Sequence, residues 1–143
     1  MDTESKAGVR LLNAVAACNE RLVDLSTRLR LETGVNRALH EFSCRDYKTG
    51  PLLEAYVDIE LATGEGVCWW LEVEWTTEQW LIRSSLRVSH DQGQDALKEF
   101  PDRTARSLED FVNELEVATS DLVSSADSFD WRGAIRAREW GQR

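Results

Sequence analysis

Apolar residues recur at alternating steps of four and three along residues 5–32. The positions that share this spacing are Leu11, Val15, Cys18, Leu22, Leu25 and Leu29. Such a stripe is typical of an amphipathic helix with one buried face, and Gly34 is its natural end. Further apolar residues at Leu12, Val23 and Leu31 widen the stripe beyond a two-stranded coiled-coil contact. A core-facing helix is therefore favoured, with a helix-mediated dimer as the second interpretation.

The period changes to two at Leu53. Residues 53–61, 68–75 and 80–90 each alternate between apolar and polar side chains, and the segments ATGEG and TTEQ separate them. Alternation of this kind predicts strands with one buried and one solvated face. The short turns make the three strands an antiparallel meander.

A single register across the TTEQ turn keeps the apolar and charged sets on their own faces. The pairs that it sets opposite each other are Trp75–Trp80, Val73–Ile82, Trp69–Leu86 and Glu72–Arg83. A slip by one residue would reverse every side chain, so the agreement supports this register. It also predicts that Trp69 and Trp75 lie in the core and that Trp70 points the other way, while Trp80 could face either side.

The remaining segments are less periodic. Residues 35–51 suggest a short helical turn and a loop, and residues 96–100 suggest another helical turn closed by Pro101. A second long helix is expected from Asp102 or Thr104, either of which could cap it, to Ala126. Residues 127–143 form a candidate short helical tail. Its apolar positions are Trp131, Ile135 and Trp140.

This order of elements predicts an α+β fold. Each strand has one apolar face, so the N-terminal and C-terminal long helices are expected on the same face of the three-stranded antiparallel meander, as a two-layer sandwich. A chain of 143 residues with 42% hydrophobic and 30% charged residues fits a single α+β domain over residues 1–143. The other sheet face is left open.

The charge and the cysteine content limit the classes of binding partner and the cellular location expected for the protein. The net charge is −9, from 17 basic and 26 acidic residues, which disfavours nucleic acid and favours a protein partner with a basic surface. An odd number of cysteines, 3, at wide spacings favours reduced thiols. With neither a signal-peptide pattern nor an apolar run of membrane-spanning length, a cytoplasmic location without membrane contact is expected.

No catalytic or ligand-binding motif stands out. His40 and His90 lie outside any metal-ligand spacing, and Gly64 and Gly66 fit a hairpin turn better than a phosphate-binding loop. We therefore expect no metal and no cofactor, and the sequence favours a protein that is not an enzyme.

The open sheet face is the candidate site. It combines aromatic rings with carboxylates, a mixture suited to protein binding, because Tyr and Trp supply contact area and acidic groups attract a basic partner. The candidate partner-binding residues are Tyr56, Asp58, Glu60, Trp70, Glu72 and Glu74. The alternative is that Trp70 is covered by a loop or by the C-terminal tail.

A small acidic α+β domain without catalytic motifs resembles, in class only, the immunity proteins of bacterial toxin systems and the chaperones of secreted effectors. The resemblance carries over no individual residues. It implies an immunity-type inhibitor that occludes a basic partner such as a bacterial toxin. A chaperone-like homodimer that binds an effector is the alternative, and a small enzyme with a pocket between helices and sheet is a third hypothesis from another class.

Overall fold

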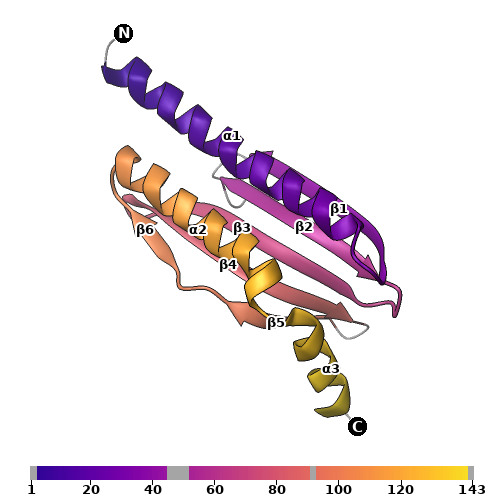
Figure 1. Cartoon of the computed structure of the whole chain (residues 1–143). Coiled ribbons are helices and arrows are strands. Elements are labelled where there is room, and N and C mark those ends of the chain that lie inside the picture. The colour runs from indigo at the N-terminus through magenta and orange to yellow at the C-terminus, as the bar shows by residue number, and fades with distance from the viewer. Residues whose placement is uncertain (1–2, 45–51, 91–92, 142–143) are drawn as a thin grey trace.

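The computed structural model describes residues 3–44, 52–90 and 93–141, which form an antiparallel sheet with two long helices on one face (Figure 1). The elements in chain order are α1 (Thr3–Arg30), β1 (Val35–Cys44), β2 (Leu53–Leu61), β3 (Gly66–Thr76), β4 (Gln79–His90), β5 (Gly93–Glu99), β6 (Arg103–Ala105), α2 (Leu108–Ser128) and α3 (Trp131–Gly141). The sheet order is β1-β2-β3-β4-β5, with β6 also paired to β4. The predicted α+β class is confirmed, with a sheet larger than the meander alone.

Helix α1 buries the predicted stripe from Cys18 onward, and Leu22, Leu25 and Leu29 are almost completely inaccessible. Gly34 follows the helix with a φ of +83°, a left-handed conformation that glycine adopts without strain. Three residues assigned to the widened stripe are instead exposed: Leu12, Val23 and Leu31.

The prediction for residues 35–44 is wrong, because β1 is a strand rather than a helical turn. It pairs antiparallel with β2, with Ala38 opposite Ile59 and His40 opposite Val57. Polar side chains lie on both faces of this edge strand, so its sequence lacks the regular apolar–polar alternation of a strand. For example, His40 lies on the α1 side, where it is hydrogen-bonded to Asn19 at 2.9 Å. The predicted loop at 45–51 lies outside the described residues.

The central register is confirmed residue by residue. Strands β3 and β4 set Trp75 opposite Trp80, and the pairs Val73–Ile82, Trp69–Leu86 and Glu72–Arg83 are those predicted. The hairpin closes through Thr77 and Glu78, whose φ values of 39° and 67° match the right-handed twist of the flanking strands.

The helical turn predicted at 96–100 is also wrong. Residues 93–99 form β5, which pairs with β4 from His90–Gly93 to Ser85–Glu99. Pairing with the exposed edge of β4 overrides the local helical preference of the segment ALKEF.

Helix α2 begins later than predicted, because its N-cap is Ser107, whose Oγ accepts a hydrogen bond from the Asp110 backbone N–H at 3.1 Å. Thr104 belongs to β6, and Asp102 lies near Arg83 instead.

The tail forms a helix as expected, and α3 begins at Trp131. Gly133 fits its first turn because its backbone N–H bonds to the Asp130 side chain, where a Cβ at position 133 would clash. The side chain of Trp140 lies outside the described part of the molecule.

The tryptophans divide between core and margin. Trp69 is completely buried, as predicted, and meets the ring of Trp131 edge to face at a centroid distance of 5.4 Å. The core assignment of Trp75 is wrong, because the ring is 47% exposed. Trp75 lies at the hairpin end of the sheet, where its ring contacts the ring of Trp80. Trp80 in turn packs against Phe111 of α2, at a ring-centroid distance of 5.1 Å.

Candidate protein-binding face

We use the name open face for the side of the sheet opposite to α1 and α2. Alternation along the strands brings the candidate residues to this side, together with charged and polar neighbours from β1, β4 and β5. Its members in the three central strands include Glu54, Tyr56, Asp58, Glu60, Cys68, Trp70, Glu72, Glu74, Arg83, Ser85 and Arg87. Helix α3 of the C-terminal tail begins on the helix side of the sheet, where Trp131 packs against Trp69.

A hollow of about 400 Å³ lies in this face. It is lined by Glu54, Tyr56, Asp58, Cys68, Trp70, Arg87 and Gln94. Tyr56 stands directly opposite Trp70 across β2 and β3, so two rings and two carboxylates border one depression. The hollow combines apolar area with negative charge.

The ring of Trp70 carries a cation on its face. The guanidinium carbon of Arg87 lies 4.2 Å from the ring centroid, which is a cation–π contact. The Arg87 Nε–H also donates to Ser85 Oγ at 2.9 Å, which helps to hold the side chain over the ring. Trp70 is therefore half-buried, with Arg87 over one face of its ring.

Tyr56 is held by the neighbouring edge strand. Its hydroxyl donates to a carboxylate oxygen of Glu41 in β1. This hydrogen bond, followed by partial burial and nearby negative charge, raises the pKa of Tyr56 to about 12. The phenol therefore stays protonated at physiological pH and offers ring area rather than a base.

The acidic side chains of the open face lie closer together than stability alone would favour. Glu54 and Glu72 stand directly opposite each other in β2 and β3, an arrangement of like charges that destabilises a sheet. Burial, followed by the charge of Glu74, raises the pKa of Glu72 even though Arg83 opposes the shift. Burial also raises the pKa of Asp58.

Arg83 compensates part of this charge. Its guanidinium lies 3.7 Å from Glu72, 3.9 Å from Glu74 and 3.8 Å from Asp102, so one cation is shared among three carboxylates. The cross-strand neighbourhood of Glu72 and Arg83 predicted from the sequence is present, but it leaves an excess of negative charge.

The six predicted site residues therefore fall into groups. Tyr56, Asp58 and Trp70 border the hollow, while Glu72 and Glu74 lie beside it around Arg83. Glu60 is at the far end of β2, paired with Arg37 at 3.5 Å.

Sequence reasoning missed Glu41 and Gln94, because both lie in strands that were not recognised. Ala38 and Phe42, which share the helix side of β1, were the available signal, and His40 between them interrupts it.

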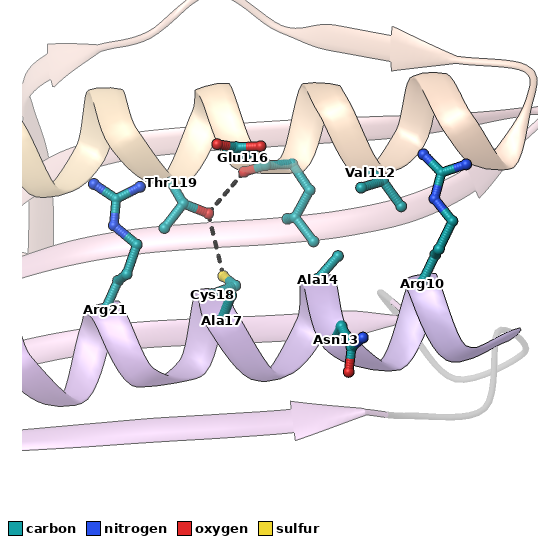
Figure 2. Close-up of a pocket in the computed structure, with 10 residues that line it drawn as sticks. Arg10, Asn13, Ala14, Ala17, Cys18, Arg21, Val112, Glu116 and Thr119 are labelled. Carbon is teal, nitrogen blue, oxygen red and sulfur yellow. Dashed lines mark hydrogen bonds between the residues drawn. The ribbon is translucent and has the colours of Figure 1, made fainter. Parts of the chain in front are cut away.

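A second cavity, of about 380 Å³, lies between α1 and α2 rather than between helices and sheet. Arg10 and Arg21 extend from α1 toward α2 at the two ends of the cavity (Figure 2). Between them, Cys18 points toward Thr119. The Thr119 hydroxyl donates to the Leu115 carbonyl at 2.7 Å and lies 3.2 Å from the Cys18 sulfur. Burial raises the pKa of the Cys18 thiol, which disfavours the thiolate that a nucleophile requires.

The cysteine of the open face is equally unsuited to nucleophilic chemistry, since burial followed by the charge of Asp58 raises the pKa of Cys68 to about 12. Within the described ranges, no group of three or more His, Cys, Asp or Glu side chains is placed to hold a metal ion. His40 and His90 are instead bonded to Asn19 and Asp95.

Comparison with known proteins gave no match to a family model, to a curated protein or to a solved structure. In the part of the chain that the structure describes, no helix is both long and apolar enough to cross a membrane.

Proposed function

We propose that this chain is a non-enzymatic, acidic protein-binding module whose open face occludes a basic surface of a partner. The observation that carries the proposal is the hollow in which Tyr56 and Trp70 stand opposite each other beside Asp58 and Glu54. An immunity-type inhibitor of a bacterial toxin, acting in the cytoplasm, is the concrete form that we favour, because an enzyme that grips phosphates must present positive charge.

The electrostatics of the open face support a cationic partner. Asp58 and Glu72 have raised pKa values because of burial, and Glu72 also faces Glu54 across the strands. Basic side chains placed against these groups would relieve the repulsion and favour the ionised carboxylates. The interaction would also accelerate association by long-range attraction.

The two rings support an anchoring role. Interface hot spots are enriched in Trp and Tyr, which bury a large area at small entropic cost. Arg87 already stacks on Trp70 at 4.2 Å, so the ring is placed where a guanidinium can bind to its face. An arginine or lysine of the partner that enters the hollow would meet Asp58 and Glu54, and it would reach the face of Trp70 by displacing Arg87.

Site-specific photo-crosslinking in native cells tests the location of the binding face. A photoreactive amino acid at Gln94, an exposed position that lines the hollow, should crosslink one basic protein reproducibly. The matched control places the same group at Val117, which is 40% exposed on α2. A partner crosslinked from position 117 and never from position 94 would contradict the proposal.

The alternative of an effector-binding homodimer requires a surface on which two copies meet, and the exposed apolar residues Val9, Leu12 and Val23 of α1 are one candidate. The enzyme hypothesis receives less support, since the thiols of Cys18 and Cys68 both have raised pKa values.

A further inference from the structure

The cavity between α1 and α2 has the size and shape of a site for a small elongated molecule. Its volume of about 380 Å³ falls in the range of ligand pockets. Its lining extends along α1 from Arg10 to Arg21, about three turns or about 16 Å of helix, and along α2 from Val112 to Thr119 (Figure 2). We call it the interhelix cavity.

The middle of the interhelix cavity is apolar. Ala14 and Ala17 line it from α1, and their side chains are too small to fill the space in front of Val112 and Leu115 of α2. Leu115 and Cys18 are almost completely buried and form its floor. An aliphatic chain that lies along this floor would remove apolar surface from water on both sides, which favours binding.

At one end of the cavity the positive charge is compensated. Arg21 donates a hydrogen bond to Ser120 Oγ at 2.7 Å. Glu116, which lines the cavity, lies one turn before Ser120 on the same side of α2. Asp24 borders a neighbouring hollow together with Arg21. Two carboxylates therefore accompany this guanidinium, and they disfavour an anionic group at this end.

At the other end Arg10 lies near Val112 without a carboxylate in the lining (Figure 2). Among the described residues, Arg10 forms no ion pair. Glu109 is exposed one turn before Val112 on α2, and Lys6 is exposed one turn before Arg10 on α1, so these two flanking charges balance each other. The Arg10 end keeps a net positive charge in a chain whose net charge is −9.

We propose that the interhelix cavity binds an aliphatic monocarboxylate, with the carboxylate on Arg10 and the chain along Ala14 and Ala17 toward Arg21. A guanidinium can donate two parallel hydrogen bonds to a carboxylate, which gives strength and direction to the contact. Arg10 is exposed, so the charged group of the ligand stays in contact with water while its chain is buried. The site does not depend on the proposed binding function, because it lies on the helix side of the sheet.

Isothermal titration calorimetry of the full chain with three matched probes tests the class of ligand. Decanoate should bind at one molecule per chain. Decylamine has the same chain with a cationic group and should bind at least about tenfold more weakly, because it meets Arg10. Decanedioate should also bind more weakly than decanoate, because its second carboxylate meets Glu116. Absence of saturable decanoate binding, or tighter binding of either other probe, would overturn the proposal.

Two variants test the position of the ligand. Arg10→Gln should weaken decanoate binding by about tenfold or more, because it removes the charge-assisted hydrogen bonds. The matched control is Arg30→Gln, an exposed arginine of the same helix outside the cavity lining, which should bind like the wild type. Ala17→Leu should weaken binding by filling the cavity, and since Ala17 is exposed its melting temperature should stay unchanged.

Wild-type affinity for decanoate in both folded Arg10→Gln and folded Ala17→Leu would show that the ligand lies elsewhere and would overturn the proposal. A folded Trp70→Ala chain should bind decanoate as the wild type does, because the open face is on the other side of the sheet. The two proposals can therefore fail separately.

Discussion

Arg87 lies over the indole of Trp70, with its guanidinium carbon 4.2 Å from the ring centroid. The pair joins neighbouring strands on the open face, where carboxylates outnumber basic groups. It shows that the most prominent ring of this face is arranged to hold a cation, and that the chain itself supplies one.

Removing this cation should have opposite effects on stability and on association. Arg87→Ala loses the cation–π contact and should lower the free energy of unfolding by about 1 kcal/mol, measured by urea denaturation. The same change makes the hollow more acidic and exposes the ring, so association with a basic partner should become faster at low salt. An Arg87→Ala chain that associates more slowly would mean that Arg87 contributes directly to binding.

The sheet register can be tested at two adjacent residues with opposite orientations. Val73 is 2% exposed on the helix side, so Val73→Asp should destabilise the protein by about 3 to 5 kcal/mol by burying an unpaired charge. Glu74→Ala on the open face should change the free energy of unfolding by about 0.5 kcal/mol or less. Similar losses of melting temperature in the two variants would contradict the register.

The raised pKa of Glu72 predicts that replacing this residue with neutral glutamine increases the stability of the fold, and that the increase depends on pH. Because the folded state holds the Glu72 proton more tightly than the unfolded chain does, the ionised carboxylate costs stability above the folded-state pKa. Below the ordinary pKa of glutamate the carboxyl is protonated in both states, and this cost disappears.

Glu72→Gln should therefore be more stable than the wild type at pH 7, and the difference should shrink as the pH falls to about 4. Denaturant midpoints at the two pH values measure it, with the exposed Glu60→Gln as the control. A Glu72→Gln chain less stable than the wild type at neutral pH would show instead that the contact with Arg83 outweighs the repulsion.

The parts of the fold that sequence could predict are those where one face is fully apolar. Val73 and Ile82 alternate with charged neighbours, so the β3–β4 register followed from a period of two. Edge strand β1 was missed because His40 is polar on its helix side, where Asn19 satisfies it. Strand β5 was missed because its local sequence favours a helix and only pairing with β4 makes it extended.

The candidate site was predicted in part for the same reason. Tyr56, Asp58 and Trp70 lie on strands whose alternation was clear, and the structure brings them together. Glu41 could not be placed beside Tyr56 without β1, and the position of Arg87 over Trp70 depends on a side-chain rotamer that no pattern specifies. Trp75 was assigned to the core but is exposed. Alternation predicts which face of the sheet a side chain lies on, but it does not predict where the helix that covers this face ends.

The most direct test of the open face is the binding kinetics of the crosslinked partner with two variants of this chain. Trp70→Ala should chiefly accelerate dissociation and weaken affinity about thirtyfold, as expected for a buried aromatic anchor worth roughly 2 kcal/mol. The triple variant Asp58→Ala, Glu72→Ala and Glu74→Ala should chiefly slow association and flatten its dependence on salt. Melting temperatures establish that both variants are folded. If both folded variants bind with wild-type rates, the open face is not the binding surface.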